Sequence, residues 1–233
     1  MKFVALLSGG KDSCYNILKC NSYGHELVCL ANLAPAGDEE EINSFMYQSA
    51  AHTAIPALSM CFGVPLIRRS ISGVAAVQTM EYTFTPTDEV EDLYELLLDV
   101  QRRFPDVRGV SCGAIISNYQ RIRLENVCSR LGMTPLCYLW QRDRSDLLDE
   151  IVTAGVHAVL VKVAGAGLEP TKHLGKDLKT LQPVLRRLHE KYGLDLCGEG
   201  GEYETLGIVI NNNYCLLVLL LLWFYSYGCC CYC

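Results

Sequence analysis

The amino-acid sequence predicts an α/β fold, with a mostly parallel sheet that carries helices on both faces and a smaller C-terminal α/β part. Short apolar runs alternate with amphipathic segments along most of the 233 residues. The amphipathic segments are long enough to be the helices that connect parallel strands. Half of the residues are hydrophobic and 20% are charged, so the chain can bury a core.

Short apolar runs are the expected strands, because a strand buried on both faces of a parallel sheet is apolar throughout. The first of them leads directly into the glycine pair Gly9-Gly10, where the chain turns into the first helix. In chain order the expected strands are 2–7, 26–33, 64–68, 109–116, 136–140, 158–163 and 194–197.

The amphipathic segments between these runs are the expected helices. In the segment 87–104, acidic residues fill the first turn and two arginines close the last, which is the order that the helix dipole favours. A further helix opens at Ser117, where Gln120 completes a capping-box pattern, and ends before Gly132. The other expected helices are 12–20, 45–62, 145–154 and 181–192.

Charge and hydropathy differ between the body of the chain and its end. With 20 Lys and Arg against 26 Asp and Glu, the net charge is −6, which disfavours nucleic acid as the partner. Residues 207–233 carry no charge and form an atypical hydrophobic tail. Its apolar run 215–225 is shorter than the roughly 20 residues that span a bilayer, so no stable membrane span is expected. The tail is interpreted as a replaced terminus, with an interfacial anchor as the alternative.

The cysteines indicate a reducing compartment. Of the 13 cysteines, those before residue 207 show no C-x-x-C spacing, so neither a zinc site nor an iron–sulfur cluster is expected there. The apolar start of the chain is too short for a signal peptide. The expected location is therefore cytoplasmic.

The segment 8–13, Ser-Gly-Gly-Lys-Asp-Ser, lies between the first expected strand and the first expected helix. Its glycines allow a tight turn whose N–H groups can face phosphate oxygens, and the helix N-terminus adds partial positive charge. The spacing matches neither G-x-x-x-x-G-K-[ST] nor G-x-G-x-x-G, which argues against a kinase or a dehydrogenase. The competing interpretation is an ordinary glycine-rich turn.

This segment resembles the pyrophosphatase loop of the adenine-nucleotide α-hydrolase (PP-loop ATP pyrophosphatase) superfamily, whose members cleave ATP to AMP and pyrophosphate. The resemblance implies a Rossmann-like sheet of the HUP type, with ATP and Mg²⁺ as cofactors. It implies that Lys11 neutralises the charge of the leaving group and that Asp12 orients the metal. The residues expected to bind the nucleotide are Ser8, Gly9, Gly10, Lys11, Asp12 and Ser13.

The segments 113–128 and 197–205, together with 135–142 and 173–176, are similar to the diphthine–ammonia ligase (diphthamide synthetase) family. The similarity runs from Met1 to Thr205. It implies an AMP-forming carbon–nitrogen ligase in which ATP adenylates the carboxylate of diphthine on elongation factor 2. Pyrophosphate leaves in that step, and ammonia, supplied as ammonium, then attacks the acyl-adenylate, which gives diphthamide and AMP.

Two arginines near the start of the helix at Ser117 are candidate site residues. Arg121 and Arg123 could bind the α-phosphate or the substrate carboxylate through paired hydrogen bonds, with Arg123 as a catalytic residue. For Arg121 the alternative is an ion pair with Glu125, one helical turn away. Three weaker candidates at the same edge are Ser117, Tyr119 and Gln120.

A second candidate site follows the last expected strand, where Glu199, Glu202 and Glu204 crowd around Tyr203. Carboxylates this close are unfavourable unless a cation is bound. Because diphthine carries a trimethylammonium group, we expect Glu199, Glu202 and Tyr203 to bind that group. The alternatives are a second magnesium site or a solvated turn. In the segment 173–176, His173 and Lys176 are expected to be structural or surface residues.

The sequence divides into a PP-loop nucleotide-binding domain (1–140), a smaller substrate-binding part (141–206) and the tail (207–233). Two rival functions remain at this stage. One is a tRNA-modifying PP-loop enzyme, which would usually need a basic face or paired cysteines. The other is a nucleotide-binding isoform whose catalysis is impaired by its altered terminus. No glutaminase-like region is visible, which favours free ammonium as the nitrogen source.

Overall fold

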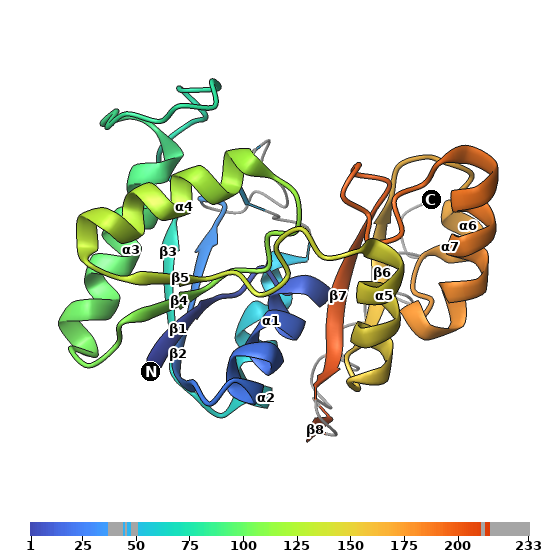
Figure 1. Ribbon diagram of the computed structural model, residues 1–233, viewed down its shortest axis with the longest axis horizontal. Helices are drawn as coiled ribbons and strands as arrows, with labels where there is room; N and C mark the ends of the chain where they lie inside the picture. The colour runs from blue at the N-terminus through green and yellow to red at the C-terminus, as the bar shows by residue number, and fades with distance from the viewer. Residues whose placement is uncertain (37–43, 45, 48–50, 211–212, 215–233) are drawn as a thin grey trace, which may run out of the picture. The chain divides into compact units, whose positions relative to one another are not determined.

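The predicted α/β fold is confirmed by a computed structural model, which describes residues 1–36, 44, 46–47, 51–210 and 213–214 (Figure 1). The chain forms two compact units. The first contains Met1–Ser8, Asp12–His52 and Val64–Arg142. The second contains Gly9–Lys11, Thr53–Gly63 and the chain from Asp143 onward.

A five-stranded sheet forms the centre of the first unit. Its order is β3-β2-β1-β4-β5, and all neighbouring strands are parallel. This order places the first strand in the middle, as a doubly wound sheet requires. The strands are β1 (Lys2–Leu6), β2 (Glu26–Ala34), β3 (Leu66–Ser70), β4 (Gly109–Ser111) and β5 (Thr134–Leu136).

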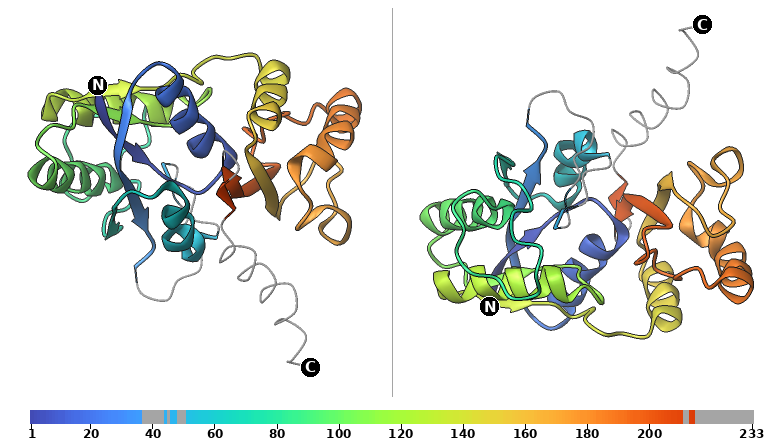
Figure 2. Two further views of the ribbon diagram at one scale, coloured as in Figure 1. Left: turned by 90° about the horizontal axis from the view of Figure 1, so that it is seen from below. Right: turned by 90° about the horizontal axis from the view of Figure 1, so that it is seen from above.

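Helices cover both faces of this sheet (Figures 1 and 2). On one face lie α3 (Glu89–Arg103) and α4 (Asn118–Leu131), which share a buried core with Val4 of β1. On the other face lies α1 (Lys11–Ser22). Side chains alternate along a strand, so Phe3, the fully buried neighbour of Val4, points toward the α1 face.

Side-chain caps begin the two core helices, and the cap at Ser117 was predicted from the sequence. Asp88 accepts a hydrogen bond from the Val90 N–H (3.0 Å), and the Ser117 hydroxyl accepts one from the Gln120 N–H (3.3 Å). The Gln120 side chain also donates its NH2 group to the Met46 carbonyl (3.1 Å). Helix α4 ends at Gly132, whose φ of 65° is left-handed.

Several expected elements are shorter than predicted. The expected strand 109–116 is reduced to β4 (Gly109–Ser111), and the expected strand 136–140 is wrong beyond Leu136, because β5 spans Thr134–Leu136 and residues 137–140 are not in a strand. At the end of β5, the Asn16 side chain binds the carbonyl of Leu136 and the N–H of Tyr138. The Asn16 side-chain oxygen takes up the Tyr138 N–H, which a longer strand would need for the ladder, so the chain turns away from the sheet.

The expected helix 45–62 is also wrong in its first part. Ser44 accepts hydrogen bonds from the N–H groups of Met46 and Tyr47, which are not helical. The helical part is η1 (His52–Ala54) followed by α2 (Ile55–Phe62), where Pro56 lies in the first turn and favours a helix start. Residues 45 and 48–50 lie outside the described residues.

The second unit contains an antiparallel sheet of order β6-β7-β8. Its strands are β6 (His157–Val163), β7 (Tyr203–Ile210) and β8 (Asn213–Tyr214). The same unit contains three helices, α5 (Arg144–Thr153), α6 (Pro170–His173) and α7 (Leu178–Tyr192). Helix α5 precedes β6, and α6 and α7 lie between β6 and β7 in the chain. The expected strand 194–197 is absent, and β7 begins after it. The apolar run 215–225 lies outside the described residues.

Within the described residues, every helix is too short or too polar to cross a bilayer.

Asn16 offers a test of how α1 is attached to the sheet. Its amide donates to the Ser111 hydroxyl and the Leu136 carbonyl, both at 2.7 Å, and it is fully buried. We expect Asn16→Ala to lower the free energy of unfolding by about 2 kcal/mol or more, because it leaves buried polar groups without partners. Urea unfolding measures this change. Asn21→Ala, at an exposed position of the same helix, should change stability by less than about 0.5 kcal/mol.

Candidate nucleotide and acceptor site

The segment 8–13 connects β1 to α1, as the sequence predicted. Gly9 has a φ of 88°, and a Cβ there would lie 2.7 Å from Cδ1 of Ile55. Its position therefore requires glycine. Gly113 is equally constrained, since a Cβ there would lie 2.6 Å from the Ser13 N atom. The Ser8 hydroxyl donates to the Ser13 hydroxyl at 3.2 Å, so the two ends of the segment are joined.

Lys11 is bound on several sides within the second unit. Its N–H donates to the Thr205 hydroxyl at 3.0 Å, and its ammonium donates to the Cys197 carbonyl. The ammonium also lies 5.3 Å from the centroid of the Tyr203 ring. Lys11 is only 3% exposed, and a buried ammonium is tolerated only where acceptors surround it. The neighbouring Gly9 carbonyl accepts from the Gly207 N–H (2.8 Å), which fixes the glycine turn to β7.

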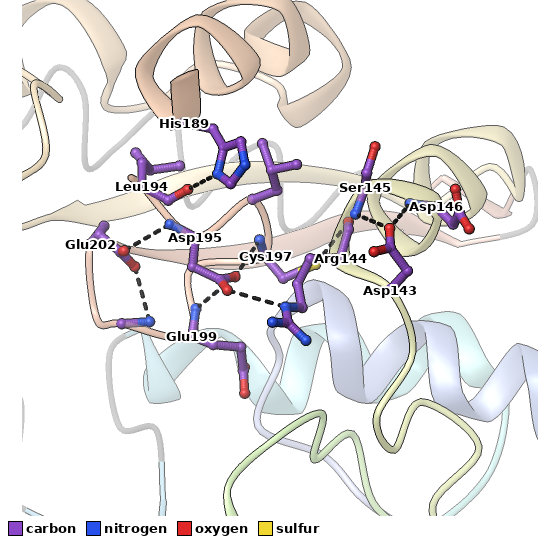
Figure 3. Close-up of polar contacts among 12 residues, drawn as sticks. Asp143, Arg144, Ser145, Asp146, His189, Leu194, Asp195, Cys197, Glu199 and Glu202 are labelled. Carbon is purple, nitrogen blue, oxygen red and sulfur yellow. Dashed lines mark hydrogen bonds and ion pairs between the residues drawn. The ribbon is translucent and has the colours of Figure 1, made fainter. Parts of the chain in front are cut away.

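The chain between α7 and β7 forms a compact loop, residues 195–202, which we call the acidic loop (Figure 3). One oxygen of Asp195 accepts from the N–H groups of Cys197 (2.8 Å) and Glu199 (3.4 Å). The two oxygens of Glu202 accept from the N–H groups of Asp195 (2.9 Å) and Gly200 (3.0 Å). Both carboxylates therefore hold the loop backbone in place.

Two contacts outside the acidic loop hold its start. Arg144 Nε lies 3.4 Å from the second oxygen of Asp195, and the Cys197 thiol donates to the Arg144 carbonyl at 3.6 Å. Next to Arg144, Asp143 caps α5, and the Asp146 N–H, ahead of the Ser145 N–H, holds the pKa of its carboxyl below the ordinary value. The first turn of α5 is thus fixed beside the loop.

The structure places the residues predicted to bind trimethylammonium in different environments. Tyr203 is 3% exposed and donates its hydroxyl to the Leu196 carbonyl (2.7 Å). Glu202 is bound to backbone N–H groups, as described above. Glu199 extends away from Asp195 in Figure 3. Glu204 lies 3.6 Å from the ammonium of Lys162. The structure therefore brings the Tyr203 ring and the Lys11 ammonium together. The closeness of the carboxylates is explained in part by the backbone N–H groups that Glu202 binds.

Arg123 is fully buried on α4. Its guanidinium donates to the carbonyls of Val77 (2.6 Å), Thr79 (3.0 Å) and Tyr119 (3.3 Å). It also lies 3.3 Å from the ring centroid of Tyr119 and 5.4 Å from that of Tyr82. These contacts attach the segment between β3 and α3 to α4. The catalytic role of Arg123 stays a prediction, and the geometry gives this residue a structural one.

The two aromatic rings around Arg123 belong to phenols that stay neutral near pH 7. Burial, ahead of the hydrogen bond to Glu91, raises the pKa of Tyr82. Burial also raises the pKa of Tyr119, and the charge of Arg123 opposes that shift.

Arg121 forms the ion pair that the sequence offered as an alternative. Its Nε lies 2.6 Å from Glu125, and its guanidinium lies 4.6 Å from the centroid of the Trp140 ring. Its side chain is 37% exposed. The weaker candidates Ser117 and Gln120 are engaged in the cap and in the contact with Met46, as described for the fold.

In the segment 173–176, His173 is buried and Lys176 lies at the surface, which fits the expectation for these two residues. His173 is buried and its Nδ1 accepts a hydrogen bond from the Glu169 N–H at 2.7 Å. Lys176 is exposed.

Sequence reasoning missed Asp195, Arg144 and Thr205. An aspartate two residues before the N–H that it binds is a local turn signal, which the apolar neighbours Leu194 and Leu196 obscured. The contacts of Arg144 and Thr205 span large separations in the sequence and have no local signal.

A parallel sheet of this order, with a glycine-rich turn that leads from its central strand into a helix, defines a nucleotide-binding α/β protein. The chain belongs to the diphthamide synthase family. The model of the diphthamide synthase N-terminal domain matches residues 1–135, and that of the C-terminal domain matches residues 143–212. The second match extends past Thr205, where the sequence resemblance was expected to stop.

Curated relatives named diphthine–ammonia ligase are similar to most of the chain. The Danio rerio protein is 53% identical over 207 residues, which cover 88% of this chain and 81% of that protein. The Homo sapiens protein is 51% identical over 208 residues, covering 88% and 78%. The Schizosaccharomyces pombe protein is 52% identical over 206 residues, covering 88% of this chain and 34% of that longer protein.

The two arginines of α4 form a matched pair for a stability test. Arg123→Met removes a fully buried guanidinium that binds three backbone carbonyls, so we expect the free energy of unfolding to fall by about 3 kcal/mol. Arg121→Met removes an exposed ion pair and should lower it by less than about 1 kcal/mol. Urea unfolding of both variants measures the difference. Equal losses would contradict the structural role given to Arg123.

Proposed function

We propose that this protein is an ATP-dependent, AMP-forming diphthine–ammonia ligase. The observation that carries the proposal is the similarity to curated enzymes of that name, which are about half identical to it over 88% of the chain. In the proposed reaction the diphthine carboxylate attacks the α-phosphorus of ATP and pyrophosphate leaves. Ammonia then attacks the acyl carbon, AMP leaves with the bonding electrons, and the surplus proton passes to solvent. The product is the amide, diphthamide.

Adenylation solves the chemical difficulty of the reaction, because a carboxylate has no good leaving group. The protein therefore has to hold two charged reactants and stabilise charge on phosphate oxygens. We assign the binding of the pyrophosphate portion of ATP to Ser8, Gly9, Gly10, Lys11, Asp12 and Ser13. Lys11 supplies the positive charge from the first turn of α1, and the backbone N–H groups of that turn supply donors.

The donor set also fits a magnesium ion, which binds proteins through one or two carboxylates together with substrate phosphates. Asp12, next to Lys11 at the start of α1, would hold it. When bound, Mg²⁺ would neutralise charge on the leaving pyrophosphate.

For the acceptor, we assign the trimethylammonium group of diphthine to Glu199, Glu202 and Tyr203. A quaternary ammonium cannot accept or donate a hydrogen bond, so carboxylates and aromatic faces are suitable partners. Arg121 is assigned to a phosphate or carboxylate of the reactants. Arg123 is assigned to positioning the start of α4, which its contacts with three backbone carbonyls support.

We further propose that the protein substrate is elongation factor 2 and that the reaction takes place in the cytoplasm. The division into a nucleotide-binding domain (1–140), a substrate-binding part (141–206) and a tail (207–233) belongs to the same proposal.

The reaction itself is tested by product analysis. Labelled ATP, ammonium and elongation factor 2 carrying diphthine should give AMP, pyrophosphate and a protein in which the diphthine carboxyl has become an amide, which incorporates label from 15N-ammonium. Lys11→Met should lower the turnover number at least about 100-fold, because it removes the charge opposite the leaving group. Release of ADP instead of AMP would contradict the proposal, as would release of AMP with transfer RNA alone.

The acceptor site is tested by steady-state kinetics with Glu202→Gln. Removing one negative charge should raise the KM for the diphthine-bearing protein by about fivefold or more and leave the KM for ATP within about twofold. Glu190→Gln, at an exposed position of α7, is the control and should change neither constant. An unchanged KM for the protein substrate in Glu202→Gln would show that this carboxylate does not bind the cation.

A further inference from the structure

We propose that Asp195 is a positioning residue for Lys11. The inference rests on the proposed function, in which Lys11 binds the phosphates of ATP. Asp195 acts through the Cys197–Gly198 peptide, whose carbonyl accepts the hydrogen bond from the Lys11 ammonium.

The Cys197–Gly198 peptide is held from both sides. In a trans peptide the N–H and C=O groups point in opposite directions. The Gly198 N–H donates to the Asp195 carbonyl at 3.0 Å, and the Cys197 carbonyl on the other side accepts from Lys11. A rotation of this peptide would therefore turn the acceptor away from the ammonium.

The Asp195 carboxylate fixes the residues on either side of that peptide. Its Oδ1 accepts from the N–H groups of Cys197 (2.8 Å) and Glu199 (3.4 Å), which precede and follow the peptide (Figure 3). Its Oδ2 lies 3.4 Å from Arg144 Nε, so the carboxylate is itself oriented by α5. The Asp195 N–H is bound by Glu202 at 2.9 Å.

The backbone conformation and the close packing of Gly198 also restrict movement of the Cys197–Gly198 peptide. Its φ is 79°, and a Cβ there would lie 2.8 Å from the Tyr203 carbonyl oxygen. The Tyr203 ring lies 5.3 Å from the Lys11 ammonium, so the same strand start contacts both the peptide and the lysine. The result is a continuous path of contacts from Asp195 through the peptide to the ammonium.

The test measures the accessibility of the Lys11 ammonium, which is independent of catalysis. The full chain is treated briefly with an N-hydroxysuccinimide ester, and the labelling rate of each lysine is followed by mass spectrometry. Lys11 should react slowly in the unsubstituted protein because it is 3% exposed. Lys172, whose side chain is 65% exposed, should react fast and serves as the internal reference for the activity of the reagent.

In Asp195→Ala we expect Lys11 to react about tenfold faster or more, because the loop that holds it loses two hydrogen bonds. Asp195→Asn keeps an acceptor oxygen and should stay within about threefold of the unsubstituted rate. Asp149→Ala breaks an exposed ion pair with Arg186 in the same unit and should leave the Lys11 rate unchanged. An unchanged rate in Asp195→Ala overturns the inference, and so does an equal acceleration in Asp149→Ala or in Asp195→Asn.

If Asp195→Ala does not fold, Gly198→Ala gives the same test from the other end of the contact path. The collision with the Tyr203 carbonyl displaces the peptide, so Lys11 labelling should accelerate. Gly201→Ala is the matched control, because Gly201 has a φ of 80° but open space around the added Cβ. Equal labelling of Lys11 in the two glycine variants overturns the inference.

Activity supplies the readout that separates this inference from the proposed function. In the exchange of labelled pyrophosphate into ATP with diphthine-bearing protein, Asp195→Ala should lower the turnover number about tenfold and leave the KM for ammonium, measured in the complete reaction, unchanged. Asp195→Asn should restore most of the rate. If the unsubstituted protein forms no AMP, the proposed function fails, and the labelling of Lys11 still decides the role of Asp195.

Discussion

The candidate site depends on one contact, the hydrogen bond from the Lys11 ammonium to the Cys197 carbonyl beside the ring of Tyr203. A buried ammonium is costly unless its surroundings supply acceptors, and here a backbone carbonyl and an aromatic face do so. The glycine turn that carries Lys11 is fixed to β7 by the bond between Gly9 and Gly207. Strand β7 and the acidic loop therefore help to fix the positions of Gly9 and Lys11.

Three charged side chains, Asp195, Glu202 and Arg123, bind backbone groups. Asp195 and Glu202 accept hydrogen bonds from N–H groups of the acidic loop, and Arg123 donates to three carbonyls around the start of α4. Backbone groups satisfy a buried charge without the need to bury a second ion. The acidic residues of the loop 195–202 therefore have a structural role, which is to bind the loop backbone, in addition to the proposed role in cation binding.

The fold was largely predictable because apolar runs and helix caps are local signals. The five parallel strands, the caps at Asp88 and Ser117 and the helix end at Gly132 all follow from residues close together in the sequence. The errors occur where distant side chains intervene. Asn16 of α1 ends β5 early, and the 194–197 run forms a turn because Asp195 binds backbone N–H groups that a strand would need.

The sequence alone determined most of the order of strands and helices, the glycine turn at 8–13 and the family resemblance, because these depend on periodicity and on short motifs. Tertiary structure alone decided which groups meet. Lys11 and Cys197 are 186 positions apart, and nothing near either residue indicates the contact. Such partners are fixed by the path of the whole chain, which is why the contacts of Arg123 with the carbonyls of Val77 and Thr79 have no local signal in the sequence.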